Sequence, residues 1–305
     1  MKILHVNTSD IVGGAAKAAY RLHHGLLKIG VDSQYMVAKK LSDEYRILGP
    51  ESTFDKLLTN FYPYLDTLGL LRYPKRQKVP FACASFPNQT AQRINKINVD
   101  IVNLHWVAGG FLRIEDIAKI NKPLVWTLHD SWPFTGGCHL PVECNRYQNQ
   151  CGNCPILRSG SDRDFSTNVH KRKEKCWENL SLNIVAPSHW LAAAAKSSSL
   201  FHDKNIQIIP HGLDTQLYKP ADKVFARNTL LLPLKKKLIL FGAYAAIRDT
   251  NKGYQLFKEA IILLLQNYSR DNIEIVIFGA SEPAHQQDFG LSVRYMGYLW
   301  DDFSL

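Results

Sequence analysis

Short apolar runs alternate with amphipathic stretches along most of the chain. The runs "KILHV" (residues 2–6) and "SQYMVA" (residues 33–38) predict strands. Residues 13–30 between them have helical spacing, with an apolar face of Ala18, Ala19, Leu22, Leu26 and Ile29 and a glycine at the end. The later runs "DIVNLHW", "PLVWTLHD", "LNIVAPS" and "IQIIPHG" predict further strands. Because these runs are nearly all apolar, they indicate strands covered on both faces, and the alternation predicts an α/β fold with a doubly wound parallel sheet.

The alternation stops and then restarts in the last third of the chain. Residues 215–236 contain Pro220, Pro233 and a run of lysines, which predicts a linker. Strands are then predicted at "KKKLILFGAY", "NIEIVIFGAS" and "VRYMGYL", with a helix at "GYQLFKEAIILLLQNY". We therefore expect a Rossmann-like domain over residues 1–214, the linker, and a partial second Rossmann-like domain over residues 237–305, which has about half the strands of a closed domain.

Residues 54–78, "FDKLLTNFYPYLDTLGLLRYPKRQK", are rich in leucine, tyrosine and phenylalanine and end in a basic cluster. This pattern has two interpretations. The segment is either a pair of packed helices or an amphipathic surface that contacts a membrane interface. Under the second interpretation, we expect Leu70, Leu71 and Tyr73 to contribute to vesicle binding.

The formal net charge of the chain is +10. This charge either reflects a solvated basic surface or indicates an anionic partner, such as a sugar nucleotide, a lipid phosphate or a negatively charged leaflet. The basic residues are scattered and no nucleic-acid-binding module is recognisable, so no nucleic acid partner is predicted. No apolar run approaches the roughly 18 residues of a membrane span, and the N-terminal run is too short for a secretory signal. We therefore expect a cytoplasmic protein.

A double glycine, Gly13 and Gly14, lies between the first strand and the first helix. Glycine allows a ligand to approach the backbone closely, and a helix N-terminus attracts anions. The motif is not GxGxxG, and Lys39 and Lys40 follow the second strand where an acidic residue would hold a ribose. These two features argue against a nicotinamide-binding domain.

Two histidines end neighbouring predicted strands. His129, followed by Asp130, comes just after the run "PLVWTL", and His105 ends the preceding run. The carboxyl ends of strands in an open α/β sheet face the ligand crevice. Each histidine is therefore either a candidate for that crevice or a structural residue with a satisfied hydrogen bond.

The segment "TGGCHLPVECNRYQNQCGNCP" contains the cysteines Cys138, Cys144, Cys151 and Cys154. Their spacing, which ends in a CxxC pair, predicts a structural zinc site with no catalytic role. Such a site would order a loop of low apolar content. A reducing cytoplasm argues against disulfides, and His139 or a different set of thiols could alter the ligands.

Arg248, Lys252 and Gly253 lie between a predicted strand and helix in "FGAYAAIRDTNKGYQLF". Basic side chains next to a helix N-terminus are suited to a diphosphate. The alternative is a loop of exposed charges.

Taken in order, these segments resemble glycosyltransferases of family 4, which have the two-domain GT-B architecture. Within the family, the closest resemblance is to bacterial exopolysaccharide and colanic-acid-type transferases. The resemblance spans the chain, and the segments that carry it are "GGAAKAAYRLHHGL", "VWTLHDSWPFTGGCHLP", "CGNCP", "VAPSHWL", "IPHGLD", "FGAY", "NKGYQL", "VIFGAS" and "GYLWDD".

The resemblance implies roles for individual residues. Gly13 and Gly14 match the loop against the donor diphosphate and acceptor, and His129 matches a histidine near the transferred sugar. Ser188 follows the next strand and faces the same cleft, and Lys252 matches a lysine that holds the donor phosphates.

Other positions match the nucleotide side of the family site less completely. Gly279 and Gly297 match strand-end turns beside the nucleotide, and Tyr298 borders the base. The family arginine that follows the strand glycine is replaced by Ala243, which leaves Arg248 as the nearby cation.

The implied reaction is a retaining transfer from a UDP- or GDP-sugar to a hydroxyl of a saccharide, expected to be lipid-linked, in cell-surface polysaccharide synthesis. No catalytic cofactor is implied, since fixed cations and N–H donors stabilise the leaving diphosphate.

The sequence departs from the family pattern at its end. The family continues with a helix, more strands and a motif of two glutamates, so we expect a chain truncated inside its donor domain. On this expectation, Ile273–Phe278 and residues 293–296 would lack neighbours and expose apolar surface. The alternatives to an active transferase are a non-catalytic remnant that binds a saccharide or a partner, and one half of a split enzyme completed by another chain.

Overall fold

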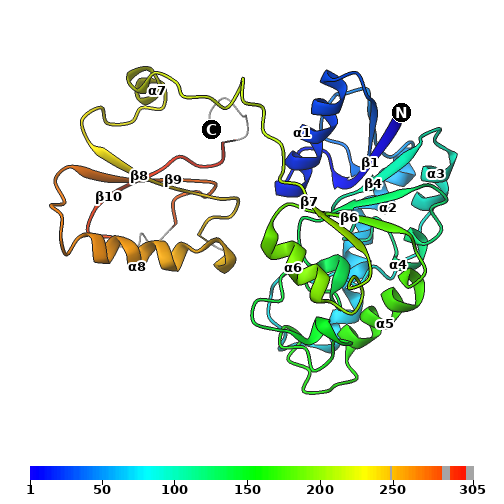
Figure 1. Cartoon of the computed structure of the whole chain (residues 1–305). Coiled ribbons are helices and arrows are strands. Elements are labelled where there is room, and N and C mark those ends of the chain that lie inside the picture. The colour runs from blue at the N-terminus through cyan, green and yellow to red at the C-terminus, as the bar shows by residue number, and fades with distance from the viewer. Residues whose placement is uncertain (248, 284–288, 300–305) are drawn as a thin grey trace. The chain divides into compact units, whose positions relative to one another are not determined.

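The computed structural model describes residues 1–247, 249–283 and 289–299, and it divides into two units. Unit 1 is Met1–Gly212 and unit 2 is Leu213–Leu305. Figure 1 shows the elements of each unit along the chain. Helix α7 (Lys223–Thr229) lies inside the segment expected to be a linker.

The strands described in unit 1 form one sheet in the order β3-β2-β1-β4-β5-β6-β7. Every neighbouring pair is parallel. The strands are β1 (Lys2–Ser9), β2 (Asp32–Lys39), β3 (Ile47–Leu48), β4 (Ile101–Leu104), β5 (Leu124–Thr127), β6 (Leu182–Ala186) and β7 (Asn205–Ile208). The strand order changes direction on either side of β1, so the carboxyl ends of β1 and β4 border a crevice. The predicted α/β class with a parallel sheet is confirmed.

Helices cover both sides of this sheet, with α1 on one side and α4, α5 and α6 on the other (Figure 1). The helical elements of unit 1 are α1 (Gly14–Lys28), α2 (Thr53–Thr67), η1 (Leu68–Arg72), α3 (Thr90–Lys96), α4 (Ile114–Ile117), η2 (Trp132–Phe134), η3 (Arg146–Gln148), α5 (Phe165–Trp177) and α6 (His189–Ser197). Coverage on both faces explains the burial of consecutive residues in the inner strands, such as Ile3–Asn7 in β1, whereas the edge strand β7 is largely exposed.

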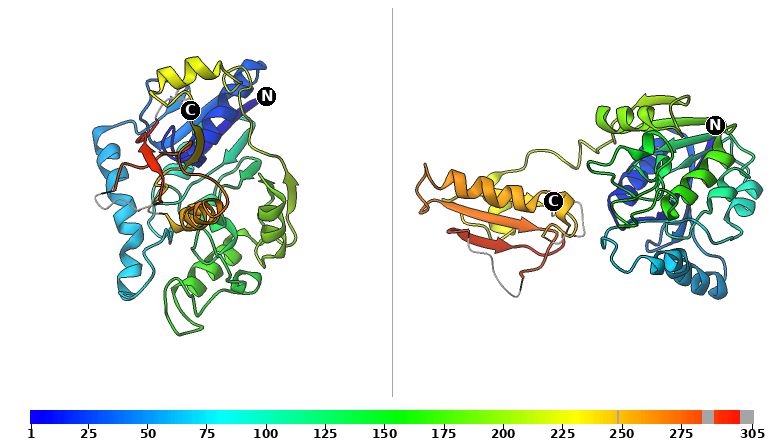
Figure 2. Two further views of the ribbon diagram at one scale, coloured as in Figure 1. Left: turned by 90° about the vertical axis from the view of Figure 1, so that its left-hand side faces the viewer. Right: turned by 90° about the horizontal axis from the view of Figure 1, so that it is seen from below.

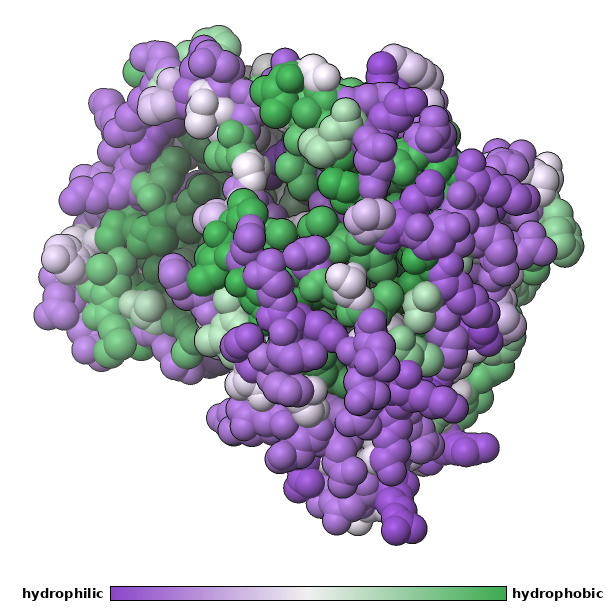
Figure 3. All heavy atoms as spheres, turned by 45° about the vertical axis from the view of Figure 1, so that its right-hand side comes forward, coloured by the Kyte–Doolittle hydropathy of each residue, from purple (hydrophilic) through white to green (hydrophobic). Residues whose placement is uncertain are grey.

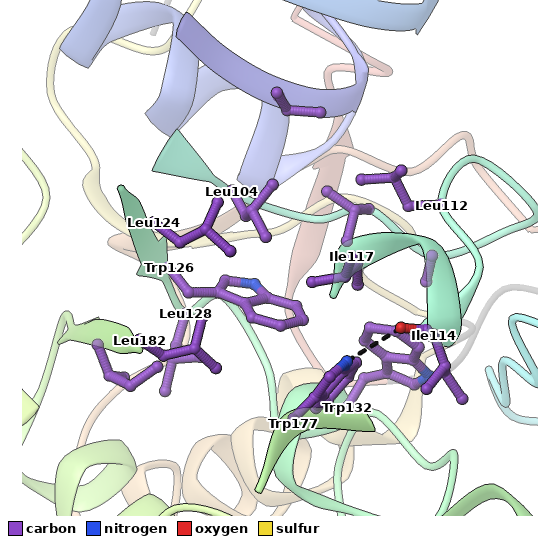
Figure 4. Packing of buried hydrophobic residues seen from close by; sticks show 14 of the residues in the cluster. Leu104, Leu112, Ile114, Ile117, Leu124, Trp126, Leu128, Trp132, Trp177 and Leu182 are labelled. Carbon is purple, nitrogen blue, oxygen red and sulfur yellow. Dashed lines mark hydrogen bonds between the residues drawn. The ribbon is translucent and has the colours of Figure 1, made fainter. Parts of the chain in front are cut away.

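The centre of the unit 1 core is a cluster of three buried tryptophans, Trp126, Trp132 and Trp177 (Figure 4). The rings of Trp126 and Trp177 meet edge to face with centroids 5.3 Å apart. The Trp177 indole N–H donates to the Ile114 carbonyl oxygen at 3.0 Å, so the polar atom of this buried ring is satisfied. The cluster joins β5, η2 and α5 and thereby supports the loop that follows β5.

The buried face of α1 differs from the predicted one. Ala16, Ala19 and His23 are buried, whereas Leu22 and Ile29 are exposed. His23 can be buried because its Nδ1 atom hydrogen-bonds with the Ser33 hydroxyl at 2.7 Å. The buried face of α1 therefore includes a polar residue with a hydrogen-bond partner on β2, whereas the spacing predicted a purely apolar face.

Unit 2 contains a parallel sheet in the order β10-β9-β8 with a helix on one side. Besides α7, its described elements are β8 (Lys237–Gly242), η4 (Thr250–Lys252), α8 (Tyr254–Leu264), β9 (Ile273–Phe278) and β10 (Ser292–Tyr295). The expectation that Ile273–Phe278 would be exposed was wrong, because β9 pairs with both neighbours and is buried.

Apolar exposure in unit 2 occurs at other positions. Leu240 on β8 and Leu256 and Leu263 on α8 are each at least 60% exposed. Figure 3 shows hydrophobic residues gathered over the displayed side of unit 2. Strands β8 and β10 are the two edges of the described sheet.

Candidate active site

Three histidines lie at the carboxyl edge of the unit 1 sheet. His105 directly follows β4, His129 follows β5 and His211 follows β7. Because all these strands are parallel, their carboxyl ends meet at the same edge, and the structure brings the three side chains together there.

The histidines form a continuous chain of contacts that runs into the interior of the sheet. His129 Nε2 hydrogen-bonds with His105 Nδ1 at 2.9 Å, and His105 Nε2 hydrogen-bonds with His5 Nδ1 at 3.0 Å. The rings of His129 and His211 stack with centroids 4.9 Å apart. His129 is therefore held by a hydrogen bond on one ring nitrogen and by a stacked ring on its face.

Burial keeps these imidazoles neutral. Burial, together with the nearby His211, lowers the pKa of His129 to about 3. Burial also lowers the pKa of His5 to about 3 and that of His105 well below its ordinary value. At neutral pH, each ring consequently has one N–H donor and one acceptor nitrogen.

Asp130, next to His129, has a separate set of partners. Its Oδ2 atom contacts His139 Nδ1 at 2.6 Å and accepts a hydrogen bond from the Trp106 indole N–H at 2.8 Å. Its Oδ1 atom accepts from the Trp132 backbone N–H. Burial alone would raise the pKa of Asp130, but His139 and these donors bring it below the ordinary value. Asp130 is thus an ionised carboxylate that fixes the loop carrying His129.

The double glycine forms the N-terminus of α1. Gly13 is the N-cap with φ 96°, a left-handed conformation that favours glycine, and no side chain caps the helix. A Cβ atom added at Gly14 would meet no other atom within 4 Å. Packing within the protein therefore does not require glycine at position 14, and the uncapped N–H groups can face a ligand.

Ser188 lies at the carboxyl end of β6, on the same edge as the histidines. It is the N-cap of α6, and its hydroxyl oxygen accepts a hydrogen bond from the Leu191 N–H at 3.2 Å. The hydroxyl hydrogen can still donate to another group.

A pocket adjoins the same edge near β1 and β2. Polar residues of its lining include Thr8, Lys39, Asn88, Thr90 and Arg93. Gly109 and Gly110, from the loop after β4, and Thr59, Tyr62 and Pro63, from α2, complete much of the wall. Hydroxyl, amide and cationic groups on one concave surface suit a ligand with several polar groups.

In unit 2, the loops after the three strands come together. The Gly279 N–H donates to the Gly297 carbonyl oxygen at 2.7 Å, and the rings of Tyr244 and Tyr298 lie 5.8 Å apart. Gly279 has φ 78°, and a Cβ there would lie 2.0 Å from the Ala243 carbonyl oxygen, so only glycine fits.

The predicted phosphate-binding residues lie at the start of α8. Gly253, with φ 75°, is the N-cap of that helix, and Lys252 directly precedes it. Lys252 is 4.0 Å from the Asp249 carboxylate and is partly exposed. Arg248 and the C-terminal residues 300–305 lie outside the described residues.

The cysteines of the predicted zinc site line one cavity. Cys138, Cys144, Cys151 and Cys154 all contribute to its wall, and all four are free thiols. Within the described part of the chain, however, no group of three or more histidine, cysteine, aspartate or glutamate side chains is arranged to hold a metal ion. The structure therefore does not support the predicted zinc site.

Buried side chains and hydrogen bonds order this loop in the structure. The side chains of Phe134, Tyr147 and Leu157 are buried. Asp164 accepts a hydrogen bond from the Cys154 N–H at 2.8 Å, and the buried Lys173 ammonium donates to the Thr135 carbonyl oxygen at 2.9 Å. Burial raises the pKa of Cys138 and Cys151 to about 12, which favours neutral thiols.

The sequence prediction placed His129 and His105 at this edge but missed His5, His139 and His211. His211 follows a predicted strand in "IPHGLD", so the rule that selected His129 would also have selected it. His5 lies within β1 and His139 within an irregular loop. No local pattern in the sequence relates these two residues to the site.

Among the described residues, no helix combines the length and the apolar character needed to cross a bilayer.

Comparison with known proteins gives consistent matches. Residues 12–217 match the Glycosyltransferase Family 4 domain. The "putative colanic acid biosynthesis glycosyl transferase WcaC" of Escherichia coli (strain K12) is 26% identical over 310 positions, which cover 93% of this chain and 70% of that protein.

Solved structures resemble the fold. A glycosyltransferase from Rickettsia africae ESF-5 superposes with a TM-score of 0.53 at 12% identity, covering 99% of this chain and 70% of that one. WaaG, a glycosyltransferase involved in lipopolysaccharide biosynthesis, gives a TM-score of 0.49 at 12% identity, covering 97% and 70%. The first likeness supports the predicted GT-B-like architecture.

Proposed function

The chain belongs to glycosyltransferase family 4, and we propose that it transfers a sugar, with retention of configuration, from a UDP- or GDP-sugar to a hydroxyl of a lipid-linked saccharide. The name of its Escherichia coli relative refers to colanic acid biosynthesis. This relation supports a role in the synthesis of a cell-surface polysaccharide, and we propose that the transfer takes place in the cytoplasm.

The observation that carries this proposal is the neutral, oriented imidazole of His129. The transition state of sugar transfer has oxocarbenium character and is positively charged. A protonated imidazole next to it would be repulsive, whereas a neutral ring can hydrogen-bond to a sugar hydroxyl. Burial and the contacts with His105 and His211 supply such a ring. The Ser188 hydroxyl, on the same edge, is the second proposed contact for the sugar.

The leaving diphosphate is the second group that the protein must stabilise. We assign it to Lys252 and to the N-terminus of α8 at Gly253, with Arg248 as a further candidate cation. In unit 1, the uncapped N-terminus of α1 at Gly13 and Gly14 is a separate candidate for an anionic group of the donor or acceptor. Fixed donors and cations of this kind stabilise developing negative charge by a few kcal/mol each. The turns at Gly279 and Gly297 allow close approach of the nucleotide to the backbone.

The pocket lined by Thr8, Lys39, Asn88 and Arg93 is the proposed acceptor site. Its hydroxyl and amide groups match sugar hydroxyls. Lys39, together with Arg93, which also pairs with the exposed Glu51 at 3.0 Å, matches a phosphate that links a saccharide to a lipid. It adjoins the carboxyl end of β1, where Thr8 lines its wall.

Donor binding is the first test. Calorimetric titration of the purified chain with UDP- and GDP-sugars should give micromolar binding with one nucleotide, and Lys252→Ala should weaken that binding at least ten-fold. Lys258→Ala, a change at another lysine of unit 2, is the matched control. If the folded chain binds neither nucleotide, the proposal fails, and a saccharide-binding protein or one half of a two-chain transferase becomes the better description.

Turnover is the second test. His129→Ala should lower the rate of donor hydrolysis or transfer by roughly 10²-fold, the scale of removing one preorganised donor. The nuclear magnetic resonance spectrum of the product should show the anomeric configuration of the donor. An inverted product would contradict the retaining mechanism but not the transferase assignment.

A further inference from the structure

Helix α2 and the following turn η1 present a continuous apolar stripe to solvent. Its six side chains are each between 50% and 75% exposed. They are Phe54, Leu57, Phe61, Tyr64, Leu68 and Leu71. Their spacing alternates between three and four residues, which places them on one face of the helix. Six large apolar side chains on one exposed face are unusual for a surface that contacts only water.

The opposite side of α2 packs on unit 1. Thr59, Tyr62 and Pro63 line the proposed acceptor pocket, and Gly110 lies so close to Tyr62 that an added Cβ would be 2.6 Å from it. The buried Asp66 carboxylate accepts hydrogen bonds from the Cys83 and Ser85 backbone N–H groups at 3.1 Å. The helix is therefore fixed to unit 1 with its apolar stripe facing away from the pocket. In Figure 2 it is the light-blue helix along the outside of unit 1.

The charges near the stripe are almost all positive. Lys56 lies on α2, and Arg72, Lys75, Arg76 and Lys78 follow the stripe within seven residues. Among the acidic residues of α2, Asp66 is buried and Asp55 is held in a capping box with Ser52. The whole chain has a formal net charge of +10.

We propose that this stripe and the adjoining basic residues bind the surface of an anionic bilayer, with α2 lying in the plane of the interface. Phenylalanine and leucine side chains enter the boundary between headgroups and acyl chains, tyrosine lies at the headgroup level, and the lysines and arginines contact lipid phosphates. The inference rests on the proposed function in one respect: a lipid-linked acceptor would enter the pocket beneath the same helix.

The structure favours a bilayer over a second copy of this chain. The three-four spacing also occurs in coiled coils, which pair over several heptads. Here α2 has only 15 residues and contains Pro63, and in a parallel pair the basic cluster of one copy would face that of the next. A fluid anionic bilayer accommodates a short helix that contains proline, and its negative charge attracts the basic cluster.

The structure also changes which residues test the idea. Leu70 is 3% exposed and packs in the core, so its substitution would damage the fold. A triple variant, Phe61→Ser, Tyr64→Ser and Leu68→Ser, removes exposed side chains only. Its control is Leu41→Ser, Tyr45→Ser and Val142→Ser, which removes equally exposed apolar side chains elsewhere in unit 1.

The experiment is flotation of the full chain with vesicles of phosphatidylethanolamine and phosphatidylglycerol, and with vesicles of phosphatidylcholine alone. We expect binding to the anionic vesicles that weakens with added salt, falls at least ten-fold in the triple variant and is unchanged in the control. A charge variant, Arg72→Gln, Lys75→Gln and Lys78→Gln, should also lose most of the binding. Equal binding of the triple variant, or no binding by the folded wild-type chain, would overturn the proposal.

Two further measurements separate this proposal from its rivals. Sedimentation without lipid should show the same mass for wild type and triple variant, and a dimer that only the triple variant loses would assign the stripe to a second copy instead. Donor hydrolysis in solution should be unchanged in the triple variant. Because vesicle binding requires no donor and donor hydrolysis requires no vesicle, failure of either proposal is seen independently of the other.

Discussion

His129 is held in one orientation by residues that do not reach the proposed substrate. Its Nε2 atom is engaged by His105, which is in turn engaged by His5. The Asn103 amide lies 3.5 Å from His5 Nδ1 and its oxygen accepts from the Thr127 hydroxyl at 3.0 Å. A buried series of this kind leaves the ring of His129 little freedom to rotate, so its outward nitrogen has a defined direction.

Removal of His105 should therefore impair turnover without removing a substrate contact. We expect His105→Ala to lower kcat by about ten- to a hundred-fold, the scale of a small misplacement of a reacting group. The Michaelis constant for the donor should change little. His105→Gln, which can still hydrogen-bond to His129, should recover part of the loss. A folded His105→Ala variant with full activity would show that His105 does not position His129.

Among the helices, α5 shows how one carboxylate can order a long loop. Asp164 is its N-cap and accepts hydrogen bonds from the Ser166 and Thr167 N–H groups and from the Cys154 N–H. Burial would raise the pKa of Asp164, but the Ser159 and Ser166 hydroxyls and these N–H groups lower it. The start of α5 and the end of the cysteine segment are thereby joined at a single side chain.

We expect Asp164→Ala to lower the free energy of unfolding by about 2–4 kcal/mol, since it removes a helix cap and leaves a buried N–H group unsatisfied. Asp162→Ala is the matched control, because that carboxylate is exposed and its ion pair with Arg146 spans 3.5 Å. Its effect should stay within about 0.5 kcal/mol. Urea unfolding of both variants measures the difference, and equal stabilities would show that Asp164 does not hold the loop.

Predictions from the sequence succeeded where an element depends on its own residues. The apolar runs became strands because a parallel sheet buries both faces of each strand. They failed where the partner is distant: His23 is buried only because Ser33 lies beside it, and β9 is buried only because β8 and β10 flank it. In the site, the position of His129 could be predicted because this residue follows a strand. His5 contributes through its contact with His105, which is 100 residues away in the sequence.

Over the whole molecule, unit 1 contains an unusual number of buried neutral histidines. The pKa of His5 is lowered to about 3, and those of His23 and His170 to about 4, chiefly by burial. In the unfolded chain, each of these groups titrates near 6.5. Between pH 6.5 and 4 the unfolded chain therefore binds protons that the folded chain does not, so the folded state loses stability as the pH falls through this window. Burial raises the pKa of Asp66, so this carboxyl group has the opposite effect on stability as the pH falls. It is a single group, whereas the buried histidines are several.

The expected result is a marked loss of stability of unit 1 between pH 7.5 and pH 5. His5 alone accounts for about 2 kcal/mol at pH 5, because it is charged in the unfolded chain and neutral in the folded one. The buried tryptophans Trp126, Trp132 and Trp177 lie in unit 1, so their fluorescence during urea unfolding reports this transition.

His5→Gln should be less stable at neutral pH yet lose about 2 kcal/mol less on acidification. If wild type and His5→Gln lose equal stability on acidification, His5 is not buried as a neutral ring, and the basis for a neutral His129 is weakened as well. Carboxylates with lowered pKa, Asp130 and Glu115 among them, lose their contribution mainly below their ordinary pKa values of 3.8 and 4.5, and they are present in both proteins, so they do not affect this comparison.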